Sequence, residues 1–351
     1  MIRVALIFGG RSAEHEISLL SASSIYKNLD KKKFKVISVY INKRGQWKVV
    51  PSPLLPLSAL NKGHFSSFLP WGKKAFAHAL QADIYFPVLH GPYGEDGTIQ
   101  GLFEMADVPY VGASVTASAL GMDKALTKSI LKAKKIPVVK HLVVLVEEWI
   151  ENKKAVLSKV KKEMALPLFV KPVCLGSSVG ISKVKEYSRL AAALDLAFSY
   201  DRKILVEAGI KGRELECSVL GNDEPQASLP GEIIPSREFY DYRDKYIEGK
   251  TSFGIPAKLT LSQVKKIQHL SLETYKALDC SGMARVDFFM EEKTGKVFVS
   301  ELNTIPGFTQ ISMYPKLWEV SGLPYPKLLE RLIELGIERH RKKKRNTGSL
   351  P

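Results

Sequence analysis

Met283-Ala-Arg-Val-Asp-Phe-Phe-Met290 and Lys296-Val-Phe-Val-Ser-Glu-Leu-Asn303 are two apolar stretches joined by a short, turn-rich segment. Both stretches are typical of β-strands, and Gly295 marks the reversal between them, so the pair is predicted to form a β-hairpin. If the hairpin turns one residue before that glycine, Asp287 lies directly opposite Glu301. The hairpin therefore places two carboxylates side by side near one of its ends.

Further polar side chains of this hairpin complete a set of oxygen ligands. Asn303 lies on the same face as Glu301, and Arg285 on the same face as Asp287, because side chains alternate along a strand. Two carboxylates and an amide suit a hard divalent ion that keeps some of its waters and bridges phosphates, Mg²⁺ above all. A solvated hairpin end with scattered charges is the alternative interpretation.

The bulk composition is that of a globular protein with two or three domains. The chain has 351 residues, of which 45% are hydrophobic and 25% charged, which is ordinary for such proteins. No apolar stretch is long enough to span a bilayer, and the N-terminus resembles a first strand rather than a signal peptide. Three widely spaced cysteines indicate neither a disulfide framework nor a zinc site. We therefore expect a cytoplasmic protein.

The formal net charge of +16 is concentrated partly at the C-terminus. We expect residues 339–351 to form a disordered basic tail. The rest of the positive charge is spread out, without a basic stripe interleaved with aromatic residues, so nucleic acid is not the favoured partner. An anionic substrate such as a nucleotide accounts for part of the excess. The basic residues of the tail are Arg339, Arg341, Lys342, Lys343, Lys344 and Arg345.

The order of predicted elements indicates an α/β (α+β) protein with three folded units. In residues 1–121, strands alternate with helices, which is typical of a doubly wound parallel sheet. Residues 122–206 are predicted to form a small α+β unit, and residues 207–338 a second one that contains the hairpin. The interval 42–81 is long for a connection and is expected to carry small elements or to cover a site.

The first predicted strand is followed by a glycine-rich loop, Gly9-Gly-Arg-Ser-Ala-Glu-His-Glu-Ile-Ser18. Glycines let a ligand approach the backbone, and the start of a helix favours an anion. The Gly-x-Gly-x-x-Gly fingerprint and its downstream acid are absent, which argues against a nicotinamide dehydrogenase. Glu14 instead suggests a ligand with an ammonium group. Equally, it could be a first-turn acid that complements the helix dipole.

A second loop, Lys171-Pro-Val-Cys-Leu-Gly-Ser-Ser-Val-Gly180, follows another predicted strand. One lysine and several backbone N–H groups at such a turn suit phosphate oxygens. This is not a Walker A loop, because its lysine precedes the glycines. An ordinary hairpin turn is the alternative, but the carboxylates of the downstream hairpin favour the phosphate interpretation.

Two further segments are candidates for a functional site. His90 ends the third predicted strand, where ligands bind in α/β proteins, and suits proton transfer or contact with a carboxylate. A turn histidine bonded to backbone is the alternative. The polar and aromatic segment Phe239–Tyr246 could close over a reactive intermediate, or could be an adhesive surface loop.

Taken in order, these motifs resemble those of the D-alanine–D-alanine ligases of the ATP-grasp superfamily. The resemblance covers nearly the whole chain except residues 42–81 and the basic tail, and the ordered set is much more specific than any single motif. It implies an ATP-grasp fold, with ATP held between the central and C-terminal units. The matching segments are Gly9–Glu16, His90–Gly91, Met122–Lys124, Lys171–Pro172, Gly176–Gly180, Glu207, Gly212–Glu214, Phe239–Tyr246, Arg285–Asp287 and Glu301–Gly307.

The resemblance implies a reaction in which ATP activates one D-alanine as an acyl phosphate, which the amine of a second D-alanine attacks. The dipeptide serves peptidoglycan precursor synthesis. Two Mg²⁺ ions, or Mn²⁺ in their place, would bind to Asp287, Glu301 and Asn303. The implied ATP contacts are Lys124, Lys171, Ser178 and Lys245 around the phosphates, Glu207, Ala208 and Ile210 at the adenine, and Glu214 at the ribose.

The resemblance also implies roles in binding the amino acids. Glu14 would hold the first ammonium group, steadied by Ser177 and Tyr246. Arg285 and the backbone N–H of Gly307 would stabilise the tetrahedral oxyanion. The contacts to the second D-alanine would come from Ser312 and Met313, with His90 near a substrate carboxylate.

Acceptor choice has a separate signal in this resemblance. A tyrosine at the position of Tyr246 goes with D-alanine as the second substrate, and a histidine there with D-lactate. Ligation to D-lactate or to another amino acid is the main alternative, and a nucleotide-regulated binding protein that uses the basic tail is a second one. Ala208 and the Cys174-Leu175 pair depart mildly from the family pattern. A homodimer is expected, since dimers are usual in the family.

Overall fold

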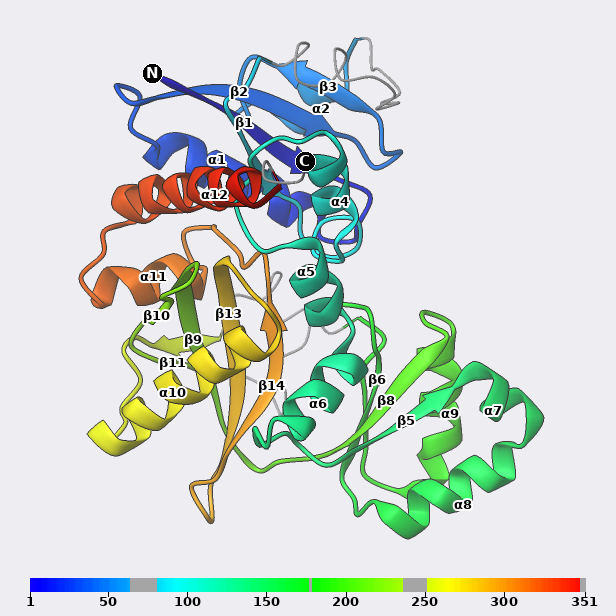
Figure 1. Ribbon diagram of the computed structural model, residues 1–351. Coiled ribbons are helices and arrows are strands. Elements are labelled where there is room, and N and C mark those ends of the chain that lie inside the picture. The colour runs from blue at the N-terminus through cyan, green and yellow to red at the C-terminus, as the bar shows by residue number, and fades with distance from the viewer. Residues whose placement is uncertain (64–80, 177–178, 236–250, 348–351) are drawn as a thin grey trace.

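A computed structural model describes residues 1–63, 81–176, 179–235 and 251–347 of the chain. These residues form three sheets, each flanked by helices, as Figure 1 shows. The mixed α/β class predicted from the sequence is confirmed by these sheets and helices. Within the described residues, no helix is both long and apolar enough to cross a bilayer.

The N-terminal sheet has the strand order β3-β2-β1-β4. Its strands β1 (Ile2–Gly9), β2 (Phe34–Ile41) and β4 (Ile84–Val88) are parallel, and the short β3 (Trp47–Val50) pairs antiparallel with β2. Strand β3 and the one-turn helix α2 (Leu57–Leu60) are the small elements expected in the long interval.

Strand β1 is buried on both faces, as a doubly wound sheet requires. Its alternate residues Val4, Leu6 and Phe8 pack in one core with helix α1 (His15–Asn28), and Ala5 and Ile7 pack in another with helix α4 (Thr98–Met105). The parallel, doubly wound arrangement predicted for this region is therefore confirmed.

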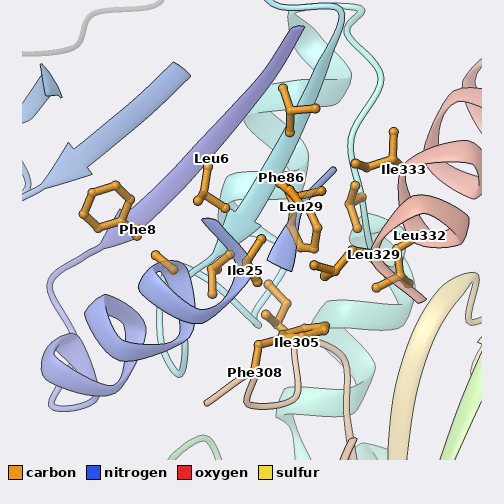
Figure 2. Close-up of a cluster of buried hydrophobic side chains, with 14 of the residues drawn as sticks. Leu6, Phe8, Ile25, Leu29, Phe86, Ile305, Phe308, Leu329, Leu332 and Ile333 are labelled. Atoms are coloured by element: carbon orange, nitrogen blue, oxygen red, sulfur yellow. The ribbon is translucent and has the colours of Figure 1, made fainter. Parts of the chain in front are cut away.

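The last helix of the chain, α12 (Tyr325–Thr347), returns to this N-terminal sheet. Leu329, Leu332 and Ile333 of α12 pack with Leu6 and Phe86 in one core, which Figure 2 shows. The core also takes in Ile305 and Phe308 from the segment that follows the hairpin. The N-terminal unit is thus completed by the C-terminal end of the chain, which a division at residue 121 does not describe.

The predicted disorder of residues 339–351 is wrong as far as Thr347, because α12 continues to that residue. The guanidinium of Arg339 donates hydrogen bonds to the carbonyls of Gly112 and Tyr110 and to Ser281, and it stacks 4.2 Å from the Tyr110 ring centroid. Lys342 and Lys343 pair with acidic side chains of the neighbouring units. These contacts stabilise a basic segment that composition alone would leave in solvent.

The central sheet is antiparallel, with the strand order β5-β8-β6-β7. Helices α7, α8 and α9 and a short 3-10 turn, η1, contribute to its core. Strand β8 runs through Ala208, so residues 207 and 208, which were expected to begin the C-terminal unit, belong to this sheet. The elements are β5 (His141–Leu145), α7 (Val146–Glu151), α8 (Lys153–Glu163), β6 (Leu168–Pro172), β7 (Ser182–Val184), η1 (Tyr187–Arg189), α9 (Leu190–Phe198) and β8 (Lys203–Ala208).

The C-terminal sheet has the order β12-β11-β9-β13-β14, with β10 also paired to β9. Helix α10 contributes to the core on one face, and helices α5 and α6, which precede the central sheet in sequence, pack in the same core. The boundary predicted between residues 121 and 122 therefore does not separate two packing units. The elements are α5 (Val115–Met122), α6 (Lys124–Ala133), β9 (Gly212–Gly221), β10 (Gln226–Ala227), β11 (Gly231–Ile234), β12 (Ser252–Gly254), α10 (Leu261–Ala277), β13 (Gly282–Glu291), β14 (Val297–Asn303) and α11 (Met313–Val320).

Candidate active site

The hairpin of β13 and β14 forms with the predicted register. Asp287 lies opposite Glu301, and Arg285 opposite Asn303, with a bulge after Asp287. The amide nitrogen of Asn303 donates to Asp287 at 3.0 Å. The four polar side chains therefore share one face of the sheet, as the alternation of the sequence predicted.

Strand β9 adds a carboxylate to this face that was not predicted from the sequence. Glu216 lies opposite Asp287 in the pairing of β9 with β13, and its Oε2 lies 3.0 Å from Nε of Arg285. The guanidinium also donates two bonds of 2.7 Å to Asp287. Although burial opposes the charge, Asp287 and Glu216 raise the pKa of Arg285 well above its usual value. Arg285 is thus a permanent, fixed cation on the sheet.

Two of the residues predicted to bind nucleotide belong to a buried row of three charged side chains. Nζ of Lys171 lies 2.6 Å from Oε2 of Glu207, and Nζ of Lys128 lies 2.6 Å from the other oxygen of the same carboxylate. Burial favours the neutral acid, but the two ammonium groups lower the pKa of Glu207 to about 2. Lys171 and Glu207 were predicted from the sequence to bind nucleotide, whereas Lys128, which no loop motif marks, was missed.

Lys124 links the helix α6 to the glycine-rich loop and to the hairpin. Its ammonium donates to the carbonyl oxygen of Leu175 at 2.9 Å and lies 3.3 Å from Oε2 of Glu301. Asp123 caps the helix just before it by accepting bonds from the backbone N–H groups of Ala125 and Leu126. The cap directs the lysine towards the space between the two sheets.

Glu14 stands at the N-cap position of α1, where the first loop turns into a helix. Its backbone N–H donates to Ser12, whose hydroxyl donates to the carbonyl of His90. A Cβ added at Gly91 or Gly176 would lie 2.8 Å or 3.1 Å from Oε2 of Glu14. These two glycines therefore allow separate loops to close around one carboxylate, and at Gly91 the positive φ of 74° also disfavours a side chain.

Both ring nitrogens of His90 have partners. Nδ1 lies 3.0 Å from the carbonyl oxygen of Ile305, and Nε2 lies 3.0 Å from the hydroxyl of Ser21. Burial lowers the pKa of the ring, which favours a neutral imidazole that donates from Nδ1 and accepts at Nε2. His90 lines the cleft but is fixed by protein partners, as in the turn-histidine alternative.

Glu95 is a second carboxylate that was not predicted from the sequence. It accepts hydrogen bonds from the backbone N–H groups of Gly91, at 2.8 Å, and Ile305, at 3.1 Å. Burial, together with the charge of Glu14, raises its pKa to about 8. His90 is hydrogen-bonded to the carbonyl of Ile305, and Glu95 accepts a hydrogen bond from the N–H of the same residue. The N-terminal unit therefore holds the segment that leads to Gly307.

One cleft brings together seven of the predicted residues. The residues that line it include Glu14, His90, Lys124, Arg285, Glu301, Asn303 and Gly307. Among the predicted residues that do not line it, Asp287 lies next to Arg285. The other described residues predicted to contact the adenine, the ribose or a phosphate lie on β6, β8, β9 and the loop after β8. Lys171, Glu207, Ala208, Ile210 and Glu214 form that group.

Two predicted substrate contacts lie at the start of α11. Ser312 is the N-cap residue of this helix and accepts a bond of 2.9 Å from the N–H of Thr309, and Met313 is buried beside it. A Cβ at Gly307 would lie 2.6 Å from Oγ of Ser312, which brings this turn close to the cleft. Ser177, Ser178, Lys245 and Tyr246 lie outside the described residues.

The donor set of the hairpin fits a magnesium-type ion. Asp287, Glu301 and Asn303 offer carboxylate and amide oxygens on two paired strands, the ligand types that Mg²⁺ and Mn²⁺ prefer. Among the described side chains, no three His, Cys, Asp or Glu residues are arranged as a complete metal site. An ion bound here would need ligands from outside this set, such as phosphate oxygens.

Comparisons with known protein families agree along almost the whole chain. A family model described as "D-ala D-ala ligase N-terminus" matches residues 3–113, and one described as "D-ala D-ala ligase C-terminus" matches residues 130–334. The chain is 49% identical over 342 residues to the D-alanine–D-alanine ligase of Solibacter usitatus, covering 97% of each chain. It is 46% identical over 366 residues to that of Heliobacterium modesticaldum, covering 99% of this chain and 98% of the relative.

Solved structures give the same result. The D-alanine–D-alanine ligase of Coxiella burnetii has a TM-score of 0.85 and 39% identity, with 99% of this chain and 98% of the other covered. The VanG D-Ala:D-Ser ligase of Enterococcus faecalis has a TM-score of 0.85 and 37% identity, with 95% and 99% covered. The similarity thus includes enzymes that differ in the acceptor named for them.

Proposed function

Because the chain belongs to the D-alanine–D-alanine ligase family, we propose that its cleft is where two D-alanines are joined at the expense of ATP. The protein is an ATP-dependent, ADP-forming ligase that makes D-alanyl-D-alanine for cell-wall synthesis. The observation that carries the assignment to this cleft is the convergence of Glu14, Arg285 and Glu301 from the N-terminal loop, β13 and β14.

The phosphates of ATP would lie against Lys124 and Lys171. Each ammonium already has a carboxylate partner, Glu301 for Lys124 and Glu207 for Lys171. The cations are therefore held in place before the substrate arrives, which favours electrostatic stabilisation of a transferring phosphoryl group. Ser178 and Lys245 complete this part of the proposal, with Glu207, Ala208 and Ile210 at the adenine and Glu214 at the ribose.

The first D-alanine would place its ammonium beside Glu14, and its carboxylate oxygen would attack the γ-phosphorus of ATP. ADP leaves, and a D-alanyl phosphate forms. The amine of the second D-alanine then attacks the carbonyl carbon, and the C–O bond to phosphate breaks. Arg285 and the N–H of Gly307 stabilise the tetrahedral oxyanion between these two events. The fixed position of Arg285 between Glu216 and Asp287 supports this role.

Asp287, Glu301 and Asn303 would hold two Mg²⁺ ions, with Mn²⁺ able to replace them. When bound, these ions neutralise charge on the phosphates of ATP. Asp287 also orients Arg285, so the same carboxylate would serve the metal and the oxyanion partner. This sharing supports the placement of phosphoryl transfer next to the oxyanion site.

The remaining proposed contacts are those to the second D-alanine and those that steady Glu14. Ser312 and Met313 are proposed to contact the second D-alanine, and His90 to lie near a substrate carboxylate. Ser177 and Tyr246 are proposed to steady Glu14. The bonds of His90 to Ser21 and Ile305 indicate that it acts through the position of its loop as well. We also propose a cytoplasmic homodimer, which light scattering of the purified protein would test.

The decisive experiment is an assay of ADP release by the purified protein with ATP, Mg²⁺ and D-alanine alone. D-Serine and D-lactate are then added in separate arms, and the products are identified by mass spectrometry. We expect D-alanyl-D-alanine as the main product in every arm. Absence of D-alanine-dependent ADP release would contradict the assignment, and a preference for a mixed product would change the acceptor.

A matched variant tests the role of the cleft. Arg285→Ala should lower kcat by on the order of a hundredfold or more while MgATP binding, measured by calorimetry, changes little. Arg213→Ala is the control, since Arg213 pairs with Glu232 and does not line the cleft. An equal loss of kcat in both variants would contradict the assignment of the reaction to this cleft.

A further inference from the structure

Lys128 is a completely buried lysine to which neither the family comparison nor the proposed mechanism gives a role. Its side chain has 0% exposure, whereas that of Lys171 has 10%. Its ammonium contacts Glu207 of the central sheet at 2.6 Å and the carbonyl oxygen of Ser300, on β14 of the C-terminal sheet, at 3.1 Å. Helix α6 thus delivers one cation to the junction of the two sheets that enclose the proposed nucleotide site.

The position of Lys128 follows from the packing of α6. Ala125 of this helix packs with Leu205 and Val173 on the central unit, and Leu131 packs in the core of the C-terminal sheet. Strand alternation puts Glu207 and Lys171 on the face of the central sheet that carries Leu205. Lys128 therefore lies between two sheets, where water cannot solvate its charge.

The three side chains Lys128, Glu207 and Lys171 comprise two cations and one anion. A buried carboxylate needs hydrogen bonds and countercharge on both oxygens. If Lys171 alone paired with Glu207, the pair would be neutral and would attract a polyphosphate weakly. When Lys128 pairs with the inner oxygen of Glu207, the three side chains together carry one net positive charge. Lys171 is the more exposed of the two lysines.

We propose that Lys128 is a positioning residue for nucleotide binding, which balances Glu207 from the buried side and leaves the charge of Lys171 to the phosphates of ATP. The proposal rests on the proposed function and adds a residue to it. Removal of Lys128 should weaken binding of MgATP more than it changes the use of D-alanine, because Glu14 and Arg285 line the cleft whereas Lys128 does not.

The test compares three variants in the full-length enzyme: Lys128→Met, Lys128→Arg and Lys132→Met. Lys132 is the matched control, because it lies one turn further along α6 and is exposed. For Lys128→Met we expect KM for ATP and Kd for MgADP to rise by roughly tenfold or more, with KM for D-alanine within about twofold of the wild type. Lys128→Arg should recover most of the loss, and Lys132→Met should behave like the wild type.

Several outcomes would overturn the proposal without touching the proposed function. One is an unchanged nucleotide affinity in Lys128→Met. Another is an equal loss for ATP and D-alanine, which would indicate a general packing role. If the wild-type enzyme itself fails to bind MgATP, the proposed function fails instead, so the two failures are distinguishable.

A second pair of variants covers the case in which Lys128→Met does not fold. Glu207→Gln and the double variant Lys128→Met with Glu207→Gln lack the buried carboxylate that Lys128 serves. Without it, burial should leave Lys128 uncharged. We therefore expect the two variants to have the same KM for ATP, within about twofold. A further large loss in the double variant would show that Lys128 acts otherwise than through Glu207.

Discussion

At the scale of single residues, the site is organised by carboxylates that hold cations. Arg285 is clamped by Asp287 and Glu216, and Lys171 by Glu207. Side chains held by such pairs lose little freedom when a substrate binds, which favours catalysis by fixed charges. The roles of these residues can be separated by removing one partner at a time.

Glu216→Gln should lower kcat by on the order of tenfold, because Arg285 loses one of its two orienting charges. KM for ATP should change little, since Lys124 and Lys171 keep their partners. Steady-state kinetics with ATP and D-alanine varied in turn measure both values. Glu232→Gln is the control, as Glu232 pairs with Arg213 instead. A rise in KM for ATP without a change in kcat would contradict this role for Glu216.

Glu95 predicts a pH dependence of stability. Burial and Glu14 raise the pKa of Glu95 from about 4.5 to about 8. Between these values the folded state holds a proton that the unfolded state has lost, so the free energy of unfolding falls as the pH rises. The slope from one such group is at most about 1.4 kcal/mol per pH unit. His90 and Arg285 are the other charged or titratable groups near it.

The measurement is urea unfolding of the wild type and of Glu95→Gln between pH 5 and pH 9. The amide introduced by this substitution cannot ionise, so the free energy of unfolding of the variant should fall less steeply over this range than that of the wild type. Parallel profiles for the two proteins would show that Glu95 does not titrate there. Glu104→Gln serves as a control, because Lys343 and Tyr110 lower the pKa of Glu104 against the effect of burial.

At the scale of elements, the start of α6 decides where Lys124 and Lys128 lie. Helix α5 ends at Met122, and α6 begins only two residues later, at Lys124. Asp123 makes the break, because its carboxylate caps the second helix and pairs with Lys203 on β8. A cap therefore sets the register of both lysines.

Asp123→Ala should lower the free energy of unfolding by about 1–2 kcal/mol, the usual effect of losing an N-cap. It should also raise KM for ATP, because the first turn that carries Lys124 frays. Asn152→Ala is the matched control, since Asn152 caps α8 away from the cleft by accepting a bond from Ala155. That variant should lose comparable stability with unchanged kinetics. Equal KM values for ATP in the two variants would show that the Asp123 cap does not affect nucleotide binding.

At the scale of the whole molecule, α12 joins the C-terminal end of the chain to the N-terminal sheet. Its leucines complete the core shown in Figure 2, and Arg339 bonds to Tyr110 and Gly112 on one side and Ser281 on the other. The site lies where these units meet. The helix therefore contributes to the site by holding its walls together.

Arg339→Ala should lower the free energy of unfolding by about 2 kcal/mol, because three hydrogen-bond acceptors and a stacked ring lose their partner. Arg341→Ala should change it by less than about 0.5 kcal/mol, since Arg341 is exposed on the same helix. Denaturant unfolding of both variants measures the difference. A similar, small effect of both substitutions would mean that the end of α12 adds nothing to stability.

Prediction from the sequence succeeded where partners are close along the chain. The register that pairs Asp287 with Glu301 follows from strand alternation and one turn glycine, both of which are local. It failed for Lys128, Glu216 and Glu95, because each of them has a partner on a distant strand or loop. A buried charge in a helix or strand looks like a solvated one until its countercharge is known.

The sequence by itself determined the family, the three folded units and the register of the β13–β14 hairpin, because ordered motifs and period-two alternation are properties of neighbouring residues. Only the tertiary structure decided which charges pair. It put Lys128 between two sheets, tied Ile305 to His90 and Glu95, and made a helix of the basic segment that begins at Arg339. The physical reason is that the pairing and burial of a charge depend on groups brought together by folding, and neither can be read from sequence spacing.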